Sequence, residues 1–130
     1  MNLLLDTCCI IWAVSEPAAL SEKSAALLQD EDASVFVSPI SAAEIACATE
    51  RGRIQPDRHW KKWFRYYLDV NQWQVEPIDL TIIEEAYSLP GEFHADPADR
   101  IITATARLKK YVLLTADRKI LDYAHVDAIW

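Results

Sequence analysis

Short, uninterrupted apolar runs alternate with longer segments of helical character, and this order constrains the fold more than any other feature of the chain. Leu3-Leu4-Leu5 and Val35-Phe36-Val37 are such runs, and residues 111–114 form a third. A strand with one face in water alternates apolar and polar residues, whereas a strand of a parallel sheet covered on both faces is apolar throughout. The pattern therefore predicts an α/β fold, a three-layer α/β/α sandwich around a central, mainly parallel sheet.

Start and stop signals predict the remaining elements. Ser41-Ala-Ala-Glu44 has the form of a capping box that opens a helix ended by Gly52, and Asp57 is expected to cap a long helix. The other expected helices cover residues 7–12, 22–29, 80–89 and 97–109 with a short one after 117, and the other expected strands cover 73–75 and 126–130. No linker or repeat interrupts this order, so we expect a single domain over residues 1–130.

Composition excludes several classes of protein. With 130 residues and 52% hydrophobic content, the chain can bury a core and does not resemble a disordered segment. No apolar run approaches the roughly 18 residues of a membrane span, and the first residues lack a basic, then apolar leader, so we expect a cytoplasmic protein with no membrane contact. Two glycines are too few for a dinucleotide-binding loop or a P-loop.

The three cysteines do not form a recognisable framework. Cys8 and Cys9 are adjacent, Cys47 stands alone, and no C-x-x-C occurs. This arrangement suits neither a set of disulfides nor a thiolate metal site. We expect all three to be small buried apolar residues.

The net charge of −7 disfavours non-specific binding of nucleic acid, because contacts with phosphate supply most of that affinity. The basic residues are unevenly distributed, however. Six of the thirteen lie between Arg51 and Arg65. A local basic surface therefore remains compatible with the acidic average.

Acidic residues stand near the end of each main expected strand. Asp6 follows the first run, Glu44 lies one turn into the helix after the second, Asp117 follows the third, and Asp96 and Asp99 open a helix. Each one alone fits a helix cap or a first-turn position. Ligands of an open parallel sheet bind beyond the carboxyl ends of its strands, and a carboxylate cluster suits Mg²⁺ or Mn²⁺. Capping and metal binding both stay open.

Four motifs carry a resemblance that covers nearly the whole chain. They are Leu3-Leu4-Leu5-Asp6-Thr7, Ser41-Ala-Ala-Glu44-Ile45, His94-Ala-Asp96-Pro97-Ala-Asp99-Arg100 and Leu113-Leu114-Thr115-Ala-Asp117. In this order they resemble the motifs of PIN-domain proteins and, more narrowly, of the VapC toxins of prokaryotic type II toxin–antitoxin systems. The resemblance implies a PIN-like fold and a metal-dependent endoribonuclease.

The same resemblance implies the site residues. Asp6, Glu44 and Asp99 match the family's principal acidic positions, and Asp117 matches a fourth that is less uniform. We expect these four to be catalytic and to hold Mg²⁺ (or Mn²⁺). Water activated by the metal would then attack the phosphodiester in line, leaving a 5′-phosphate and a 3′-hydroxyl.

Supporting positions are also implied. Asp96 matches an extra acidic position that either assists the ligands or caps the helix, and Thr7 and Thr115 match hydroxyls that hold a ligand or water. Arg100 is expected to pair with a site carboxylate or phosphate, or to form a structural ion pair. Cys8 departs from the family pattern, because many relatives carry Ser, Asn or His at this position, two residues after the first Asp. A thiol is a weaker hydrogen-bond partner than those side chains.

The resemblance further implies an RNA substrate, a cognate antitoxin of the VapB type and a homodimer. Such antitoxins insert an amphipathic helix into a groove of the toxin. The aromatic helix containing Trp60 and Trp63 could line that groove or stack bases, although core packing is the favoured interpretation of its aromatic stripe. His94 is expected to be a hydrogen-bonded surface residue in preference to a functional one.

Three alternatives remain. A small α/β phosphatase would use a D-x-D motif after the first strand, where this chain has Cys8. A phospho-receiver domain would need paired acids before the phosphorylated Asp and a Lys after a late strand, an arrangement that the chain lacks. An inactive PIN-like binding module would not need the acidic set, and metal binding would distinguish it.

Overall fold

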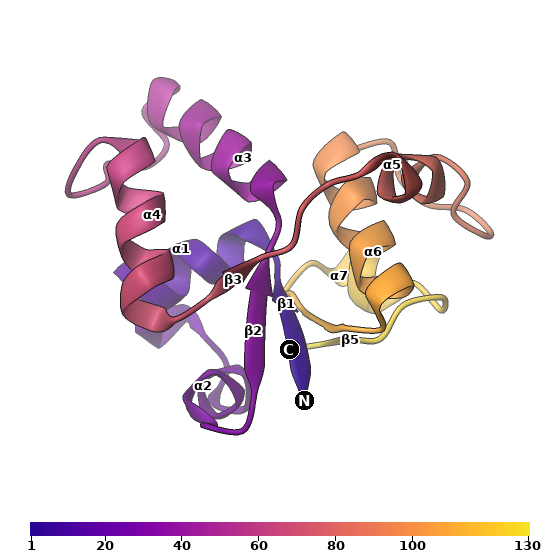
Figure 1. The fold of residues 1–130 in the computed structure, drawn as a ribbon, viewed down its shortest axis with the longest axis horizontal. Helices are drawn as coiled ribbons and strands as arrows, with labels where there is room; N and C mark the ends of the chain where they lie inside the picture. Colours follow the sequence, from indigo (N-terminus) through magenta and orange to yellow (C-terminus); the bar gives the residue numbers. More distant parts are fainter.

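The computed structural model describes all 130 residues as a five-stranded sheet with helices on both faces (Figure 1). The strands are β1 (Asn2–Leu5), β2 (Ser34–Val37), β3 (Gln74–Val75), β4 (Val112–Leu114) and β5 (Ala128–Ile129). The helices are α1 (Thr7–Ser15), α2 (Glu22–Gln29), α3 (Pro39–Glu50), α4 (Trp60–Asn71), α5 (Leu80–Ala86), α6 (Pro97–Lys109) and α7 (Arg118–Leu121), with a 3-10 turn η1 (Pro17–Ala19). None of these helices has the length and apolar character needed to cross a membrane.

The sheet is parallel at every pairing and has the strand order β3-β2-β1-β4-β5. From β1 the chain adds β2 and β3 on one side, then crosses over and adds β4 and β5 on the other. Strand order therefore reverses between β1 and β4. The register pairs Leu5 with Val37 on one side and with Leu114 on the other, so the carboxyl ends of all three central strands are level.

Alternate side chains of β1 divide the core between the two faces of the sheet. Leu3 and Leu5 pack into one cluster with buried residues of α1, α3 and α4, whereas Leu4 packs into another with residues of α6 and α7. All three leucines are fully buried, and each contributes about 2 kcal/mol by its removal from water. The three-layer α/β/α prediction is confirmed, and the unbroken apolar run exists because both faces of β1 are covered.

The expected start of α4 and the expected end of α5 are wrong. α4 begins at Trp60 with His59 as its N-cap, because Asp57 instead accepts hydrogen bonds from its neighbour Arg58 and from the Tyr67 hydroxyl. α5 ends at Ala86, well before residue 89, and the chain then enters the loop that leads to α6. Neither limit disturbs the order of elements.

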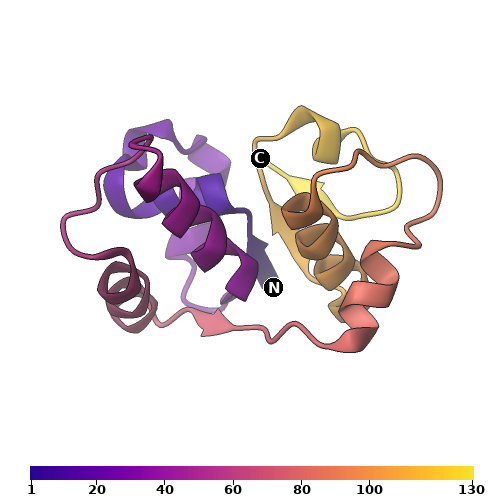
Figure 2. The ribbon, with the colours of Figure 1, turned by 90° about the horizontal axis from the view of Figure 1, so that it is seen from above.

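Seen from above, α3 and α6 lie on opposite sides of the central strand (Figure 2). The two helices contact each other, and α5 packs on α6 through Ile82 and Ala86. The first turns of α3 and α6 therefore border the carboxyl ends of β1 and β4. The fold directs three connections, β1–α1, β2–α3 and β4–α7, to the same edge of the sheet.

Candidate active site

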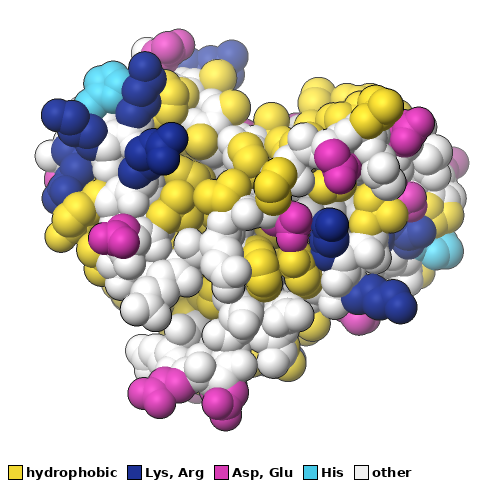
Figure 3. Space-filling view, in the orientation of Figure 1, with side chains coloured by type: hydrophobic (Ala, Val, Ile, Leu, Met, Phe, Trp, Pro, Cys, Tyr) yellow, Lys and Arg dark blue, Asp and Glu magenta, His cyan; other side chains and the backbone are white.

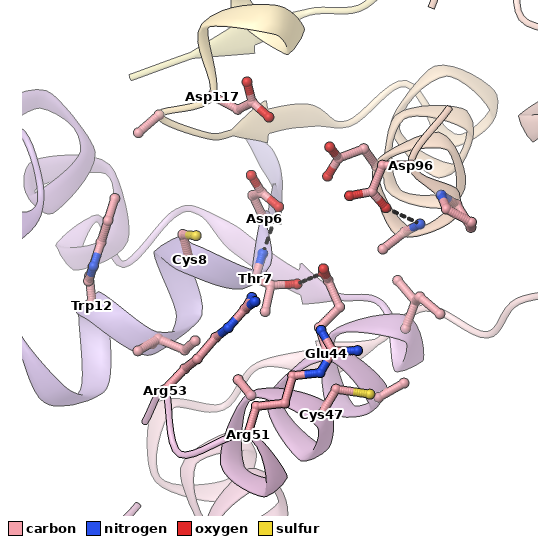
Figure 4. A pocket seen from close by; sticks show the side chains of 18 residues that line it. Asp6, Thr7, Cys8, Trp12, Glu44, Cys47, Arg51, Arg53, Asp96 and Asp117 are labelled. Carbon is pink, nitrogen blue, oxygen red and sulfur yellow. Dashed lines mark hydrogen bonds between the residues drawn. The ribbon is translucent and has the colours of Figure 1, made fainter. Parts of the chain in front are cut away.

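A pocket of about 1060 Å³ lies beyond the carboxyl ends of β1 and β4. This is the point of strand reversal, where open parallel sheets bind their ligands. Five carboxylates from separate parts of the chain line it: Asp6, Glu44, Asp96, Asp99 and Asp117. In Figure 4, Asp6, Asp96 and Asp117 point toward a common space. The structure thus brings together every acidic residue that the sequence put forward.

Asp6 is both a helix cap and a member of this cluster. Its Oδ1 accepts a hydrogen bond from the Thr7 amide at 2.8 Å, and its Oδ2 accepts one from the Thr115 hydroxyl at 2.6 Å. The side chain is buried, being only 7% exposed. A carboxylate oxygen has more than one lone pair, so each anchored oxygen can still ligate a cation. Capping and metal binding are compatible at this position.

Glu44 does not belong to a capping box, and that prediction is wrong. Ser38 is the N-cap of α3, so the helix begins before the expected motif. Ser41 is fully buried and lies 2.8 Å from the Thr7 hydroxyl, which donates to Glu44 Oε1 at 2.5 Å. Thr7 has one hydroxyl proton, so Ser41 must donate to Thr7. The Ser41–Thr7–Glu44 chain fixes Glu44 against the start of α1.

The first turn of α6 contributes two carboxylates with different environments. Asp96 is exposed and caps the helix by accepting from the Ala98 amide at 2.9 Å, which is one of its two expected roles. Asp99 makes no capping bond; its Oδ2 lies 2.6 Å from His94 Nε2. His94 is half-buried, and the hydrogen bond expected for it is present, with a pocket carboxylate as its partner. The only sequence signal for this contact was the position of His94 in the same motif.

Asp117 continues the pattern at the end of β4. It caps α7 by accepting from the Lys119 amide at 2.9 Å, and its own amide donates to the Thr115 hydroxyl at 3.0 Å. Thr115 therefore connects Asp117 to Asp6. One donor atom each from His94, Asp99 and Asp117 lie within 4.8 Å of one another.

No Lys or Arg forms an ion pair with any of the five pocket carboxylates; of all the ion pairs in the molecule, one reaches the cluster, from His94 to Asp99. Burial raises the pKa of Asp6, Glu44 and Asp99, local hydrogen bonds lower it, and the neighbouring carboxylates raise it again. An oxygen-rich cluster with uncompensated charge fits a hard divalent cation. The residues present therefore suit the metal that the family implies.

Arg100 does not serve this cluster. Its guanidinium donates to the carbonyl oxygens of Ala86 at 3.0 Å and Phe93 at 2.9 Å. Neither the pairing with a site carboxylate nor the structural ion pair expected from the sequence is present. Arg100 instead connects the end of α5, the following loop and α6.

The expectation of three buried cysteines is wrong for two of them. Cys9 is buried, whereas Cys8 and Cys47 are exposed and line the pocket, because α1 and α3 each direct one cysteine to it. Burial and then the surrounding carboxylates raise the pKa of Cys8 to about 11. In the metal-free protein the thiol is therefore uncharged at neutral pH.

Basic side chains lie next to the acidic cluster. Arg51 and Arg53 line the pocket and approach it from the end of α3 (Figure 4). Further Lys and Arg gather over the α3–α4 side of the molecule (Figure 3). Trp63 is buried in the core, which confirms the favoured interpretation for it, whereas Trp60 is half-buried and packs against the edge of the same cluster.

Residues 3–126 match the PIN domain family. The chain is also 31% identical to Ribonuclease VapC22 of Mycobacterium tuberculosis over 126 residues, covering 95% of this chain and 93% of that protein. The chain belongs to the PIN-domain family. Within it, the resemblance to the VapC ribonucleases is confirmed.

Solved structures agree with this PIN-domain fold. VapBC2 from Rickettsia felis, bound to a DNA fragment of its promoter, contains a chain that matches with a TM-score of 0.74 and 14% identity, covering 99% of this chain and 98% of that one. A toxin–antitoxin complex from Klebsiella pneumoniae matches with a TM-score of 0.67 and 18% identity over 98% and 96%. VapBC-1 from nontypeable Haemophilus influenzae gives 0.63 and 18% over 99% and 97%.

The raised pKa values predict that the metal-free PIN domain loses stability as pH rises. Between the ordinary carboxyl pKa near 4 and the raised values, the folded state binds more protons than the unfolded state, so the free energy of unfolding falls with increasing pH. Urea unfolding in EDTA from pH 4 to pH 8 measures this slope. In the Asp99→Asn variant the free energy of unfolding should fall less steeply with pH. An equal slope in that variant would show that the pKa of Asp99 is not raised in the folded protein.

Proposed function

We propose that this VapC-family protein hydrolyses RNA at the acidic pocket in a reaction that depends on a divalent cation, Mg²⁺ or Mn²⁺. Family membership makes it an endoribonuclease of the toxin type. One observation carries the finer statement: five carboxylates line one pocket, and no Lys or Arg forms an ion pair with them. Such a site attracts a cation and, through it, a phosphate.

Asp6, Glu44, Asp99 and Asp117 would hold the cation. When bound, it would supply charge neutralisation at the scissile phosphate and a more acidic water for attack. The chain's own hydroxyls prepare the ligands: Thr115 orients Asp6 Oδ2, and Thr7 orients Glu44 Oε1. Because these bonds exist before any ligand arrives, the carboxylates need little reorganisation on binding. Asp96 caps α6 at the rim of the pocket and would add one more negative charge to it without holding the cation.

Arg51 and Arg53 support RNA as the polymer that is bound. They line the same pocket as the carboxylates, so a phosphate next to the scissile one can reach a guanidinium while the scissile group lies at the cation. The exposed Lys61, Lys62 and Arg65 of α4 extend the positive surface on that side. This local surface offsets a chain charge of −7.

Two protein partners complete the proposal. A cognate VapB-like antitoxin would inhibit by covering the pocket, where the carboxylates favour a cationic side chain. A second copy of the chain would dimerise through the exposed apolar residues at the two ends of α5, where Leu80 is 72% and the following Tyr87 is 59% exposed. The solved relatives from Rickettsia felis and Haemophilus influenzae are described as VapBC proteins, which supports a toxin–antitoxin pairing.

Cleavage of end-labelled total RNA by the purified protein, freed of any antitoxin, tests the function. We expect discrete cuts with Mn²⁺ or Mg²⁺, none with EDTA, and products with 5′-phosphate ends. Asp122→Asn, purified in the same way, is the matched control for the Asp99→Asn variant. Asp122 is exposed at the end of α7 and lies outside the pocket, so the Asp122→Asn protein should cleave RNA normally. A folded protein that binds the cation but leaves every RNA intact would favour the inactive binding module, and release of phosphate from small phosphomonoesters would favour the phosphatase.

A further inference from the structure

We propose that His94 is a direct nitrogen ligand of the divalent cation, together with Asp99 and Asp117. The inference rests on the proposed metal-dependent function. It adds a histidine to a set of proposed ligands that otherwise consists of four carboxylates. It assigns the ion a mixed nitrogen and oxygen environment. It also predicts which cations the site prefers.

The distances allow the three donors to share one ion. Donor atoms of His94, Asp99 and Asp117 all lie within 4.8 Å of one another, and His94 Nε2 is 2.6 Å from Asp99 Oδ2. Metal–nitrogen and metal–oxygen bonds of about 2.1 Å place two ligands of one ion at most about 4.2 Å apart. Side-chain movements of about half an ångström would therefore close the set around a cation. Nε2 would ligate as a neutral imidazole with the ring proton on Nδ1, so metal binding would replace the hydrogen bond between Nε2 and Asp99 Oδ2.

The loop before α6 holds His94 in place through contacts that involve no other part of the site. The His94 ring stacks on Phe93, with ring centres 4.4 Å apart, and Phe93 packs edge-on against Tyr123 at 4.9 Å. Arg100 fixes the Phe93 carbonyl, and the Tyr123 hydroxyl donates to the Pro90 carbonyl at 2.5 Å. A solvated surface histidine would not need this support. The arrangement gives Arg100 its role, which is to position the loop that carries a ligand.

An imidazole ligand changes the metal preference. Carboxylate and water ligands suit Mg²⁺ and Mn²⁺ alike, whereas an imidazole nitrogen favours a transition metal over Mg²⁺. The intact protein should therefore bind Mn²⁺ more tightly than Mg²⁺. Removing the His94 imidazole should reduce Mn²⁺ affinity at least about 10-fold and change Mg²⁺ affinity less.

Electron spin-echo envelope modulation of the Mn²⁺-loaded full-length protein tests the ligation directly. We expect modulation from a directly bound ¹⁴N nucleus, its loss in His94→Gln, and its retention in His59→Gln, where an exposed histidine at the start of α4 is replaced. Calorimetric titration with Mn²⁺ and Mg²⁺ gives the two affinities for each protein. Bound Mn²⁺ without nitrogen modulation in the unaltered protein would overturn the proposal and reduce His94 to a positioning residue for Asp99. Modulation that persists in a folded His94→Gln protein would overturn it as well.

The outcomes separate this inference from the proposed function. Nitrogen-ligated Mn²⁺ in a protein that cleaves no RNA would support the ligand and contradict the nuclease. RNA cleavage that depends on Mn²⁺, without nitrogen modulation, would support the nuclease and overturn the ligand.

Discussion

Replacing Asp99 with asparagine is expected to abolish RNA cleavage while leaving the fold intact and making the metal-free protein more stable. Asp99 contacts His94, has a carboxylate oxygen within 4.8 Å of one of Asp117, and makes no capping bond that α6 needs. A metal site supplies several kcal/mol of transition-state stabilisation, and a loss of about 4 kcal/mol lowers the rate about 1000-fold. The gain in stability follows from removing a half-buried carboxylate whose pKa is raised.

Single-turnover cleavage rates with Mn²⁺ and urea unfolding in EDTA measure the two effects. Asp96→Asn is the informative companion, because asparagine caps a helix as well as aspartate does. Asp96 is exposed at the rim, so we expect its variant to keep most of the activity. If Asp99→Asn cleaves RNA at the normal rate, Asp99 holds no catalytic metal. If Asp96→Asn loses as much activity as Asp99→Asn, Asp96 is itself a ligand.

The fold followed from the sequence because burial on both faces leaves a clear pattern. Leu3, Leu4 and Leu5 are all fully buried, and only a covered parallel strand requires three successive apolar residues of this kind. Helix starts were harder to place. Ser41 and Asp57 are residue types that often cap helices. In the structure, however, the Ser41 side chain hydrogen-bonds to Thr7 and the Asp57 side chain to Tyr67, so neither caps a helix. Local preference is a weak guide wherever a polar side chain has a distant partner.

The candidate site was predictable in its carboxylates but not in the polar contacts around them. Asp6, Glu44 and Asp117 follow strands, and they converge because parallel strands end at one edge of the sheet; Asp96 and Asp99 reach the same edge from the start of α6. The contact of His94 with Asp99 depends on the path of a loop, which no periodicity describes. The exposure of Cys8 and Cys47 depends on which side of each helix faces the pocket. These contacts were determined by packing, so only the structure could supply them.

Replacing Thr115 with valine is expected to lower both metal affinity and cleavage rate about 10- to 100-fold, the usual range for losing a group that orients a metal ligand. The Thr115 hydroxyl donates to Asp6 Oδ2 at 2.6 Å and accepts from the Asp117 amide at 3.0 Å. Valine keeps the shape and removes both bonds. Asp6 then loses an anchor, and the amide loses its acceptor, at a cost of about 1–3 kcal/mol in stability.

Thr103→Val is the control, because it makes the same chemical change at a hydroxyl that forms no hydrogen bonds. It is fully buried like Thr115, and its hydroxyl has no hydrogen-bond partner, so Thr103→Val should be neutral or stabilising and leave Mn²⁺ binding unchanged. Thr115→Ser retains a hydroxyl and should restore most of the affinity. Mn²⁺ titration, RNA cleavage and urea unfolding of the three variants separate the roles of Thr115. A Thr115→Val protein that is less stable but binds Mn²⁺ normally would show that the hydroxyl supports only the fold, and the connection from Asp117 to Asp6 would then have no part in holding the metal.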